Sequence, residues 1–162
     1  MLHLRTLTPI DEGRMLDILT DSRIKQTYML PDFSQKQDAS PLFHRLMELS
    51  QDARYYVRGI CLEDRLIGFL NHVSLSGQTM EIGYVIHPDY QGRGYMTGAL
   101  ALAIQDLFSL GYKEVTAGAF EENLASIRVM EHAGMHKLAM TDTIEYRGET
   151  HQCVYYAIRK TE

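Results

Sequence analysis

The residues with the clearest chemical meaning are glycines placed between a strand pattern and a helix pattern. Gly92 and Gly94 follow the strand-like run TMEIGYVIHP (79–88), and Gly98 falls inside the apolar helical run that starts near Arg93. The first N–H groups of a helix have no intrahelical partner, and the helix dipole adds positive potential there. Glycines let an anion approach that backbone, and Arg93 adds a cation. The segment Gln91 to Met96 is therefore predicted to be an anion cradle, most simply for a pyrophosphate.

Two nucleotide-binding motifs can be compared with this turn. The letters GRGYMTG form a loose G-x-G-x-x-x-G, and Glu114 follows near the usual acidic offset of a dinucleotide site. Glu114 falls at the start of its strand, however, whereas a ribose-binding acid belongs at the strand's end. No G-x-x-x-x-G-K-[ST] is present, which excludes a P-loop. An NAD(P)-dependent oxidoreductase that uses the Gly92–Gly98 turn stays as the alternative.

The turn and a second segment of the chain together resemble the motifs of one known family. The stretch EIGYVIHPDYQGRGYMTGAL (81–100) resembles the acyl-CoA signature Q/R-x-x-G-x-G/A of the GNAT (Gcn5-related) N-acetyltransferases, with Gln91 and Gly94 at its first two fixed positions. Met96 replaces the final Gly or Ala. The segment NLASIRVMEHAGM (123–135) resembles the same family's N-x-x-S-x-R-x-x-E-K-x-G-F region, with His132 and Met135 as departures. The two together are similar to the RimJ/RimL-like branch, the ribosomal-protein N-terminal acetyltransferases.

This resemblance implies an acyltransferase that moves an acetyl group from acetyl-CoA to an amine. It implies that the pantetheine lies between two parallel strands, here 79–87 and 113–120, and that a Val85 or Ile86 N–H polarises the thioester carbonyl. Ser126 would serve the departing thiolate. The cofactor contacts expected from the resemblance are Tyr84, Val85, Ile86, Gln91, Gly92, Arg93, Gly94, Tyr95, Met96, Asn123, Ser126 and Arg128. Asn123 would equally serve as a helix N-cap, and Arg128 could pair with an acid on its own helix.

The amine must lose a proton, and a buried carboxylate with a raised pKa is one way to accept it. Glu81 is the leading residue, because it interrupts an apolar strand that runs into the predicted acyl-CoA site. Strand alternation places it on one face with Gly83, whose small size leaves space beside the carboxylate. A solvent-facing Glu81 is the alternative, and His72 and His87 are further possible bases.

The amine acceptor is not named by the sequence. A protein N-terminal α-amine and a small-molecule amine both fit, and a catalytically silent CoA-binding regulator is a third class of function. The loop 28–40, with Tyr28 and Phe33, falls where the family's acceptor pocket forms. His132 and His136 in HAGMH are not expected to bind a metal, because the glutamate of H-E-x-x-H is missing and Gly134 should end the helix between them.

Both strands and helices are predicted among the elements that must position these residues. Strands are predicted over 2–7, 53–63, 65–76, 79–88 and 112–120, with a final hairpin of 135–146 and 150–160. Helices are predicted over 9–20, 21–27, 41–51, about 93–110 and 123–133. This order indicates an α/β (α+β) fold of the GNAT acyl-CoA N-acyltransferase type. Its central sheet would be mostly antiparallel, with one splayed parallel strand pair and flanking helices.

Bulk composition sets the remaining expectations. The chain has 162 residues, which suits a single domain over 1–162, and its formal charge of -5 argues against binding nucleic acid or an anionic membrane. No run is long enough for a membrane span, and the N-terminus does not resemble a signal peptide. Cys61 and Cys153 sit in apolar strand patterns, which favours reduced, buried thiols and a cytoplasmic location. A monomer or a homodimer is expected from the resemblance.

Overall fold

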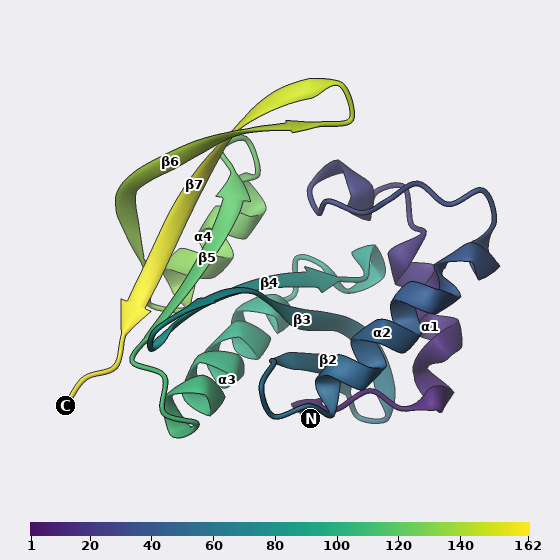
Figure 1. The fold of residues 1–162 in the computed structure, drawn as a ribbon, viewed down its shortest axis with the longest axis horizontal. Coiled ribbons are helices and arrows are strands. Elements are labelled where there is room, and N and C mark those ends of the chain that lie inside the picture. Colours follow the sequence, from purple (N-terminus) through teal and green to yellow (C-terminus); the bar gives the residue numbers. More distant parts are fainter. The chain divides into compact units, whose positions relative to one another are not determined.

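The computed structural model describes residues 1–162 and has a mixed α/β architecture around a seven-stranded sheet (Figure 1). The strands follow the order β1-β2-β3-β4-β5-β7-β6. The strands are β1 (Leu2–Arg5), β2 (Val57–Leu62), β3 (Arg65–Ser76), β4 (Thr79–Ile86), β5 (Glu114–Phe120), β6 (His136–Tyr146) and β7 (Glu149–Arg159). The helices are α1 (Glu12–Leu19), α2 (Ser40–Ser50), α3 (Tyr95–Ser109) and α4 (Leu124–His132).

The parallel strand pair expected from the strand–helix–strand pattern is confirmed. β4 pairs with β5 in parallel, in a register that runs from Thr79 opposite Glu114 to Glu81 opposite Thr116. β1–β2, β2–β3, β5–β7 and β6–β7 pair antiparallel. A sheet that is mostly antiparallel with one parallel pair is the predicted fold class. Glu81 stands at the last register position of that pair.

Local hydrogen bonds explain where the predicted element boundaries were wrong. The helix expected over 21–27 is only a 3-10 turn, Ile24–Gln26, because the Asp21 carboxylate accepts from the backbone N–H of Arg23 at 2.8 Å and forms a tight turn there. The strand expected from residue 53 begins at Val57, because Asp52 accepts in the same way from Arg54 at 3.0 Å. Helix α3 begins at Tyr95, directly after Gly94 with its φ of 81°.

The chain divides into two compact units, each with a core of its own. The first comprises Met1–Asn71 and Tyr84–Ala99, and the second comprises His72–Gly83 and Leu100–Glu162. In the first unit α1 and α2 lie side by side (Figure 1) and bury an apolar cluster that includes Met15, Ile18, Phe43, Val57 and Phe69. The prediction of one domain over 1–162 stays a prediction.

The second unit is built on the strands β5, β6 and β7, with α4 against β5 (Figure 1). Its buried side chains include Met80, Ile82, Leu107, Val115 and Met130. Leu100 and Ala103, on the same stripe of α3 as Leu107, are fully buried.

Cys61 and Cys153 are free, buried thiols, as expected from the sequence. None of the helices is long and apolar enough to cross a membrane.

Candidate active site

The glycine turn of the first unit has the backbone conformation that only glycine adopts easily. After β4, a 3-10 turn (Pro88–Tyr90) and an extended Gln91 lead to Gly92 with φ 75° and Gly94 with φ 81°. Both angles lie in the left-handed region, which L side chains avoid. The backbone N–H of Gly98 then donates to the Gly94 carbonyl at 3.1 Å, which opens the hydrogen-bond ladder of α3. The N–H groups before Gly98 therefore stand at a helix N-terminus without helical acceptors.

The space in front of the turn is open. A Cβ added at Gly92 or Gly94 would meet no atom within 4 Å, so both glycines border free volume. Gly98 has a different role, because a Cβ there would come within 2.9 Å of Leu2 Cδ2 and interfere with packing against β1. Two of the three glycines thus shape the predicted cradle, and the third allows the helix to pack.

Met96, the departure from the family pattern, does not project into the cradle. Its side chain is 7% exposed and belongs to the buried core. An alanine or glycine is therefore not needed at this position to keep the cradle open, because only the Met96 backbone is available at the turn.

Two arginine side chains near the turn contact the aromatic residue Tyr90. Arg93 lies over it at 5.9 Å, and Arg65 Nη1 donates to the Tyr90 hydroxyl at 3.0 Å.

The end of β4, which leads into the turn, is held from two sides. Val85 and Ile86 are buried, and a Cβ at Gly68 would lie 2.2 Å from the Val85 carbonyl oxygen, so β3 needs a glycine to approach β4 here. The His87 N–H donates to the Ile67 carbonyl at 2.7 Å, and Gln91 Nε2 donates to the Ile86 carbonyl at 3.4 Å. The turn is thereby anchored to a rigid strand end.

Glu81, in the second unit, is half-buried on β4, and its surroundings favour the protonated form of its carboxyl group. Burial raises the pKa of its carboxyl group, a weak hydrogen bond from Ser74 Oγ at 3.4 Å opposes that rise, and the charge of Asp142 adds to it. The predicted direction of the shift is therefore present. A carboxylate with a raised pKa binds a proton more readily, which is the property that a general base toward an amine requires.

Asn123 serves as the N-cap of α4. Its Oδ1 accepts from the backbone N–H of Ser126 at 3.2 Å, and it precedes the first helical residue, Leu124. Ser126 lies part-buried in the first turn of α4, and Arg128 is exposed further along the same helix. Of the two roles left open for Asn123 by the sequence, the cap is present, while the cofactor contact stays a prediction.

The other predicted residues have clear structural partners. His87 Nδ1 accepts from the Asp89 N–H at 3.1 Å, so this ring helps to build the turn after β4. The part-buried Tyr28 donates to Asn71 Oδ1 at 2.6 Å and meets Phe69 edge to face, and burial raises the pKa of its hydroxyl. Phe33 lies under Lys25 Nζ at 5.9 Å. A role of Tyr28 and Phe33 toward an acceptor stays a prediction.

Glu114, which the dinucleotide alternative would use on a ribose, is engaged elsewhere. Its carboxylate accepts from Thr79 Oγ1 at 3.1 Å and lies 3.7 Å from Arg159 Nη1. These contacts tie together the first residues of β4 and β5 and the end of β7. The position therefore has a structural explanation that needs no nucleotide.

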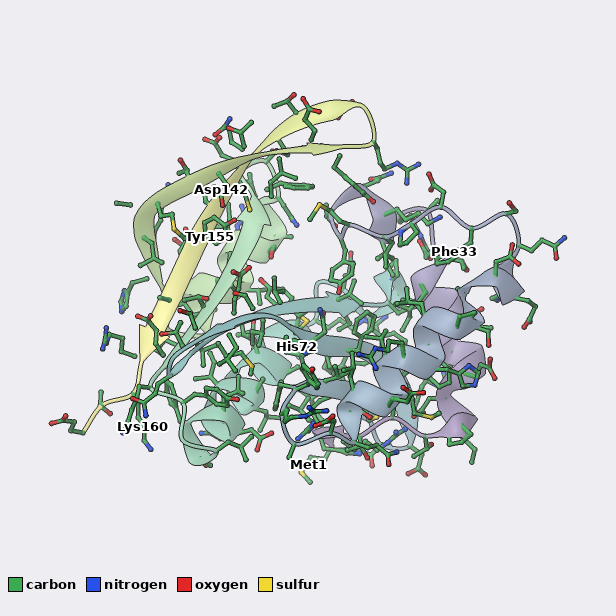
Figure 2. The ribbon with its side chains drawn as sticks, viewed as in Figure 1. Met1, Phe33, His72, Asp142, Tyr155 and Lys160 are labelled. Atoms are coloured by element: carbon green, nitrogen blue, oxygen red, sulfur yellow. The ribbon has the colours of Figure 1, made fainter.

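Sequence reasoning missed the polar group formed by Asp142, Cys153 and Tyr155. Tyr155 is buried, and its hydroxyl donates to Asp142 Oδ2 at 2.7 Å (Figure 2). The period-two pattern of β7 does place Cys153 and Tyr155 on one face. Nothing in the sequence brings Asp142 to them, because the β6–β7 register shifts between Lys137 and Thr141.

Comparisons with known proteins agree with this architecture. The family model described as "Acetyltransferase (GNAT) domain" matches residues 1–136. The probable N-acetyltransferase YjcK of Bacillus subtilis is 37% identical over 95 residues, which are 55% of this chain and 52% of that protein. The chain thus spans about half the length of this curated relative.

Two solved structures share the fold. One is RimL, a ribosomal L7/L12 alpha-N-protein acetyltransferase in complex with coenzyme A, with a TM-score of 0.87, 18% identity and coverage of 98% of this chain and 93% of that one. The other is spermidine N-acetyltransferase from Vibrio cholerae with CoA and spermine, with a TM-score of 0.82, 16% identity and coverage of 98% and 95%.

The family match extends over most of the chain and over both segments that carry the resemblance. This chain belongs to the GNAT acetyltransferase family. It shares its fold with RimL and with the spermidine N-acetyltransferase.

The cap on α4 yields a direct prediction. Asn123→Ala removes the acceptor for the Ser126 N–H and should lower the free energy of unfolding by about 1 kcal/mol. Asn123→Asp keeps an oxygen in the capping position and should retain most of that stability. Urea denaturation of the two variants measures the difference. Equal stability of Asn123→Ala and the unchanged protein would contradict the capping role.

Proposed function

We propose that this protein transfers an acetyl group from acetyl-CoA to a primary amine by direct attack in a ternary complex. The observation that carries the proposal is the left-handed glycine turn at the N-terminus of α3, open to free space at Gly92 and Gly94. Such a turn presents several N–H groups to an anion. Membership of the acetyltransferase family makes coenzyme A the natural ligand for it.

The residues of the first unit suit a pyrophosphate and a pantetheine arm. The backbone of Gln91 to Met96 would hold the pyrophosphate, and Arg93 would add a mobile positive charge. The polar backbone of Tyr84, Val85 and Ile86 would hold the pantetheine, and a Val85 or Ile86 N–H would bind the thioester oxygen as it gains negative charge. When bound, acetyl-CoA supplies the activated acyl group.

The residues of the second unit suit the proton transfers. Glu81 would accept the proton that the amine loses as its nitrogen forms the new C–N bond, directly or through one water. Ser126 would donate a hydrogen bond to the sulfur as the C–S bond breaks. Asn123 and Arg128 are proposed to assist on the cofactor side of α4.

Two acceptor classes fit the proposal. RimL is named for a protein N-terminal amine, and the Vibrio cholerae enzyme is named for spermidine, so one fold accommodates both. The loop 28–40, with Tyr28 and Phe33, is proposed to contact the acceptor. We propose a cytoplasmic protein that acts as a monomer or homodimer, without a metal ion and without a nucleic-acid partner.

Coenzyme A binding tests the cradle. Gly94→Ala forces a side chain into a left-handed backbone position and places a methyl group in the space proposed for the pyrophosphate, so it should weaken CoA binding at least about tenfold. Gly77→Ala is the matched control, since Gly77 also has a positive φ of 62° and open surroundings, but lies in the β3–β4 turn. Isothermal titration of CoA into both variants measures the effect.

Gly77→Ala should bind CoA as the unchanged protein does. Equal CoA affinity of the two variants would reject the cradle. An unchanged protein that binds NAD(P)H and not CoA would favour the oxidoreductase alternative.

The proton acceptor is tested by Glu81→Gln. Because a base is active only when deprotonated, and the pKa of Glu81 is raised, the rate of the unchanged protein should fall as the pH falls through that pKa. Glu81→Gln should lower kcat/KM by about 100-fold and remove this acid limb. The control is Glu121→Gln, an exposed acid.

The measurement is CoA thiol release between about pH 6 and pH 9, with spermidine and a peptide with a free N-terminus as acceptors. An unchanged rate for Glu81→Gln across this range rejects Glu81 as the base. Tight CoA binding with no thiol release from any amine would favour a silent regulator.

A further inference from the structure

An open cleft in the first unit lies beside the turn that follows β4. Its lining comes from α1, from the β2–β3 hairpin and from the 3-10 turn after β4, and comprises Arg14, Leu62, Glu63, Asp64, Arg65 and Tyr90. Gln91, the first residue of the proposed cradle, directly follows Tyr90 in the sequence. The cleft and the cradle therefore adjoin each other along one short segment of the chain.

Three arginines gather around the phenol ring of Tyr90. Arg65 Nη1 donates to the hydroxyl oxygen at 3.0 Å, and the Arg93 guanidinium lies 5.9 Å from the centre of the ring. The hydrogen bond from Arg65 lowers the pKa of the Tyr90 hydroxyl, burial opposes this change, and the charge of Arg14 adds to the lowering. Positive groups thus approach Tyr90 from α1, from β3 and from the turn itself.

None of these three arginines forms an ion pair with a carboxylate of the chain. Such pairs are made elsewhere by Arg5, Arg23, Arg45, Arg54 and Arg159. The whole chain is acidic, with a formal charge of -5, so carboxylates are not scarce. The charge around Tyr90 is therefore a local positive patch on an acidic protein.

Arg14 has the least favourable surroundings of the three. Its Nε donates to the Leu66 carbonyl at 3.1 Å, but its Nη2 is buried and has no hydrogen-bond partner. A buried donor without a partner costs free energy, and in native proteins a bound water or ion is a common explanation for one. An anion in the cleft would offset part of this cost through its charge, without touching Nη2.

Arg65 and Tyr90 are the groups that an anion in the cleft could touch. Arg65 is exposed, and only one of the five N–H donors of a guanidinium is engaged here, in the bond to Tyr90. The Tyr90 hydroxyl accepts that bond, so its own O–H is available to donate. Two adjacent donors with a further positive charge behind them suit a doubly charged phosphate group.

The acidic residues of the cleft do not cancel this charge. The Glu63 carboxylate pairs with the N-terminal ammonium of Met1. Asp64 is exposed and forms no ion pair with Arg14 or Arg65. Asp64 should repel an anion in the cleft, so that its removal and the removal of Arg65 should act in opposite directions.

We propose that this cleft is a phosphate site, in which Arg65 and the Tyr90 hydroxyl donate to the phosphate oxygens and Arg14 adds positive charge. Two sources share this chemistry, namely the phosphate on the ribose of CoA and free inorganic phosphate. Adjacency to the cradle favours the first source, because CoA carries this phosphate on the same ribose that bears its pyrophosphate. Assignment to CoA rests on the proposed function, whereas the site itself does not.

Isothermal titration with CoA and with dephospho-CoA, which lacks the ribose phosphate, tests the first source. The unchanged protein should bind CoA about tenfold more tightly than dephospho-CoA, because only CoA offers a charged partner to Arg65 and Tyr90. Arg65→Gln should remove this preference, and Asp64→Asn should increase it. The control is Arg45→Gln, which changes an exposed arginine of α2 and should keep the preference.

Titration of the protein without cofactor with inorganic phosphate, followed through the side-chain N–H resonance of Arg65, tests the second source. Saturable shifts that are lost in Tyr90→Phe, together with equal affinities for CoA and dephospho-CoA, would assign the cleft to free phosphate. If phosphate leaves Arg65 unchanged and Arg65→Gln has no effect on the preference for CoA over dephospho-CoA, the inference is overturned. If phosphate binds in this Tyr90-dependent way but CoA does not bind, the site stands and the proposed function fails.

Discussion

The backbone conformation of Gly92 and Gly94 is the constraint on which the proposed site depends. Two left-handed residues between a strand and a helix reverse the chain so that α3 begins with its N–H groups facing open space. A side chain at either position would strain the turn and occupy that space. The rest of the turn keeps this geometry fixed, since Gln91 donates to the end of β4 and Met96 is buried. The flexibility of glycine is thus used to build a rigid feature.

Strand β4 connects the two kinds of chemistry that the proposed reaction needs. Its last residues lead directly into the cradle, and Glu81 sits at the last position of its parallel register with β5. A strand fixes the spacing of its residues within narrow limits. The proposed base, Glu81, and the backbone proposed to bind the thioester, at Val85 and Ile86, come from one continuous segment of the sequence.

Local sequence signals were sufficient for most elements. Gly111 and Gly134 end α3 and α4 with positive φ, as their places after apolar periodic runs predict, and Pro88 falls just beyond the end of β4. Boundaries were missed where a side chain competes with the backbone. Asp21 and Asp52 each cap a short turn that propensity alone does not reveal. The motif residues predicted the family because two segments matched it together.

The contacts around Glu81 could not be predicted from the sequence, because they depend on how the strands pair. Burial of its carboxyl group could be anticipated from the apolar strand around it, but which residues of β6 and β7 share one face follows from the register, which shifts between Lys137 and Thr141. Tyr155 illustrates the same limit, because a buried tyrosine in a strand normally indicates packing, and its hydroxyl partner is set by the register. Met96 departs from the family pattern, and its burial follows from the helical period of α3.

The turn from Gln91 to Met96 is proposed to bind the pyrophosphate of acetyl-CoA. The most direct measurement is a titration of the isotope-labelled protein with CoA, followed through the backbone amide resonances. The largest, saturable shift changes are expected at the amides of Gly92 to Met96, because their N–H groups would donate to the phosphates. Saturable CoA binding that leaves these amides unchanged, or no CoA binding at all, would contradict it.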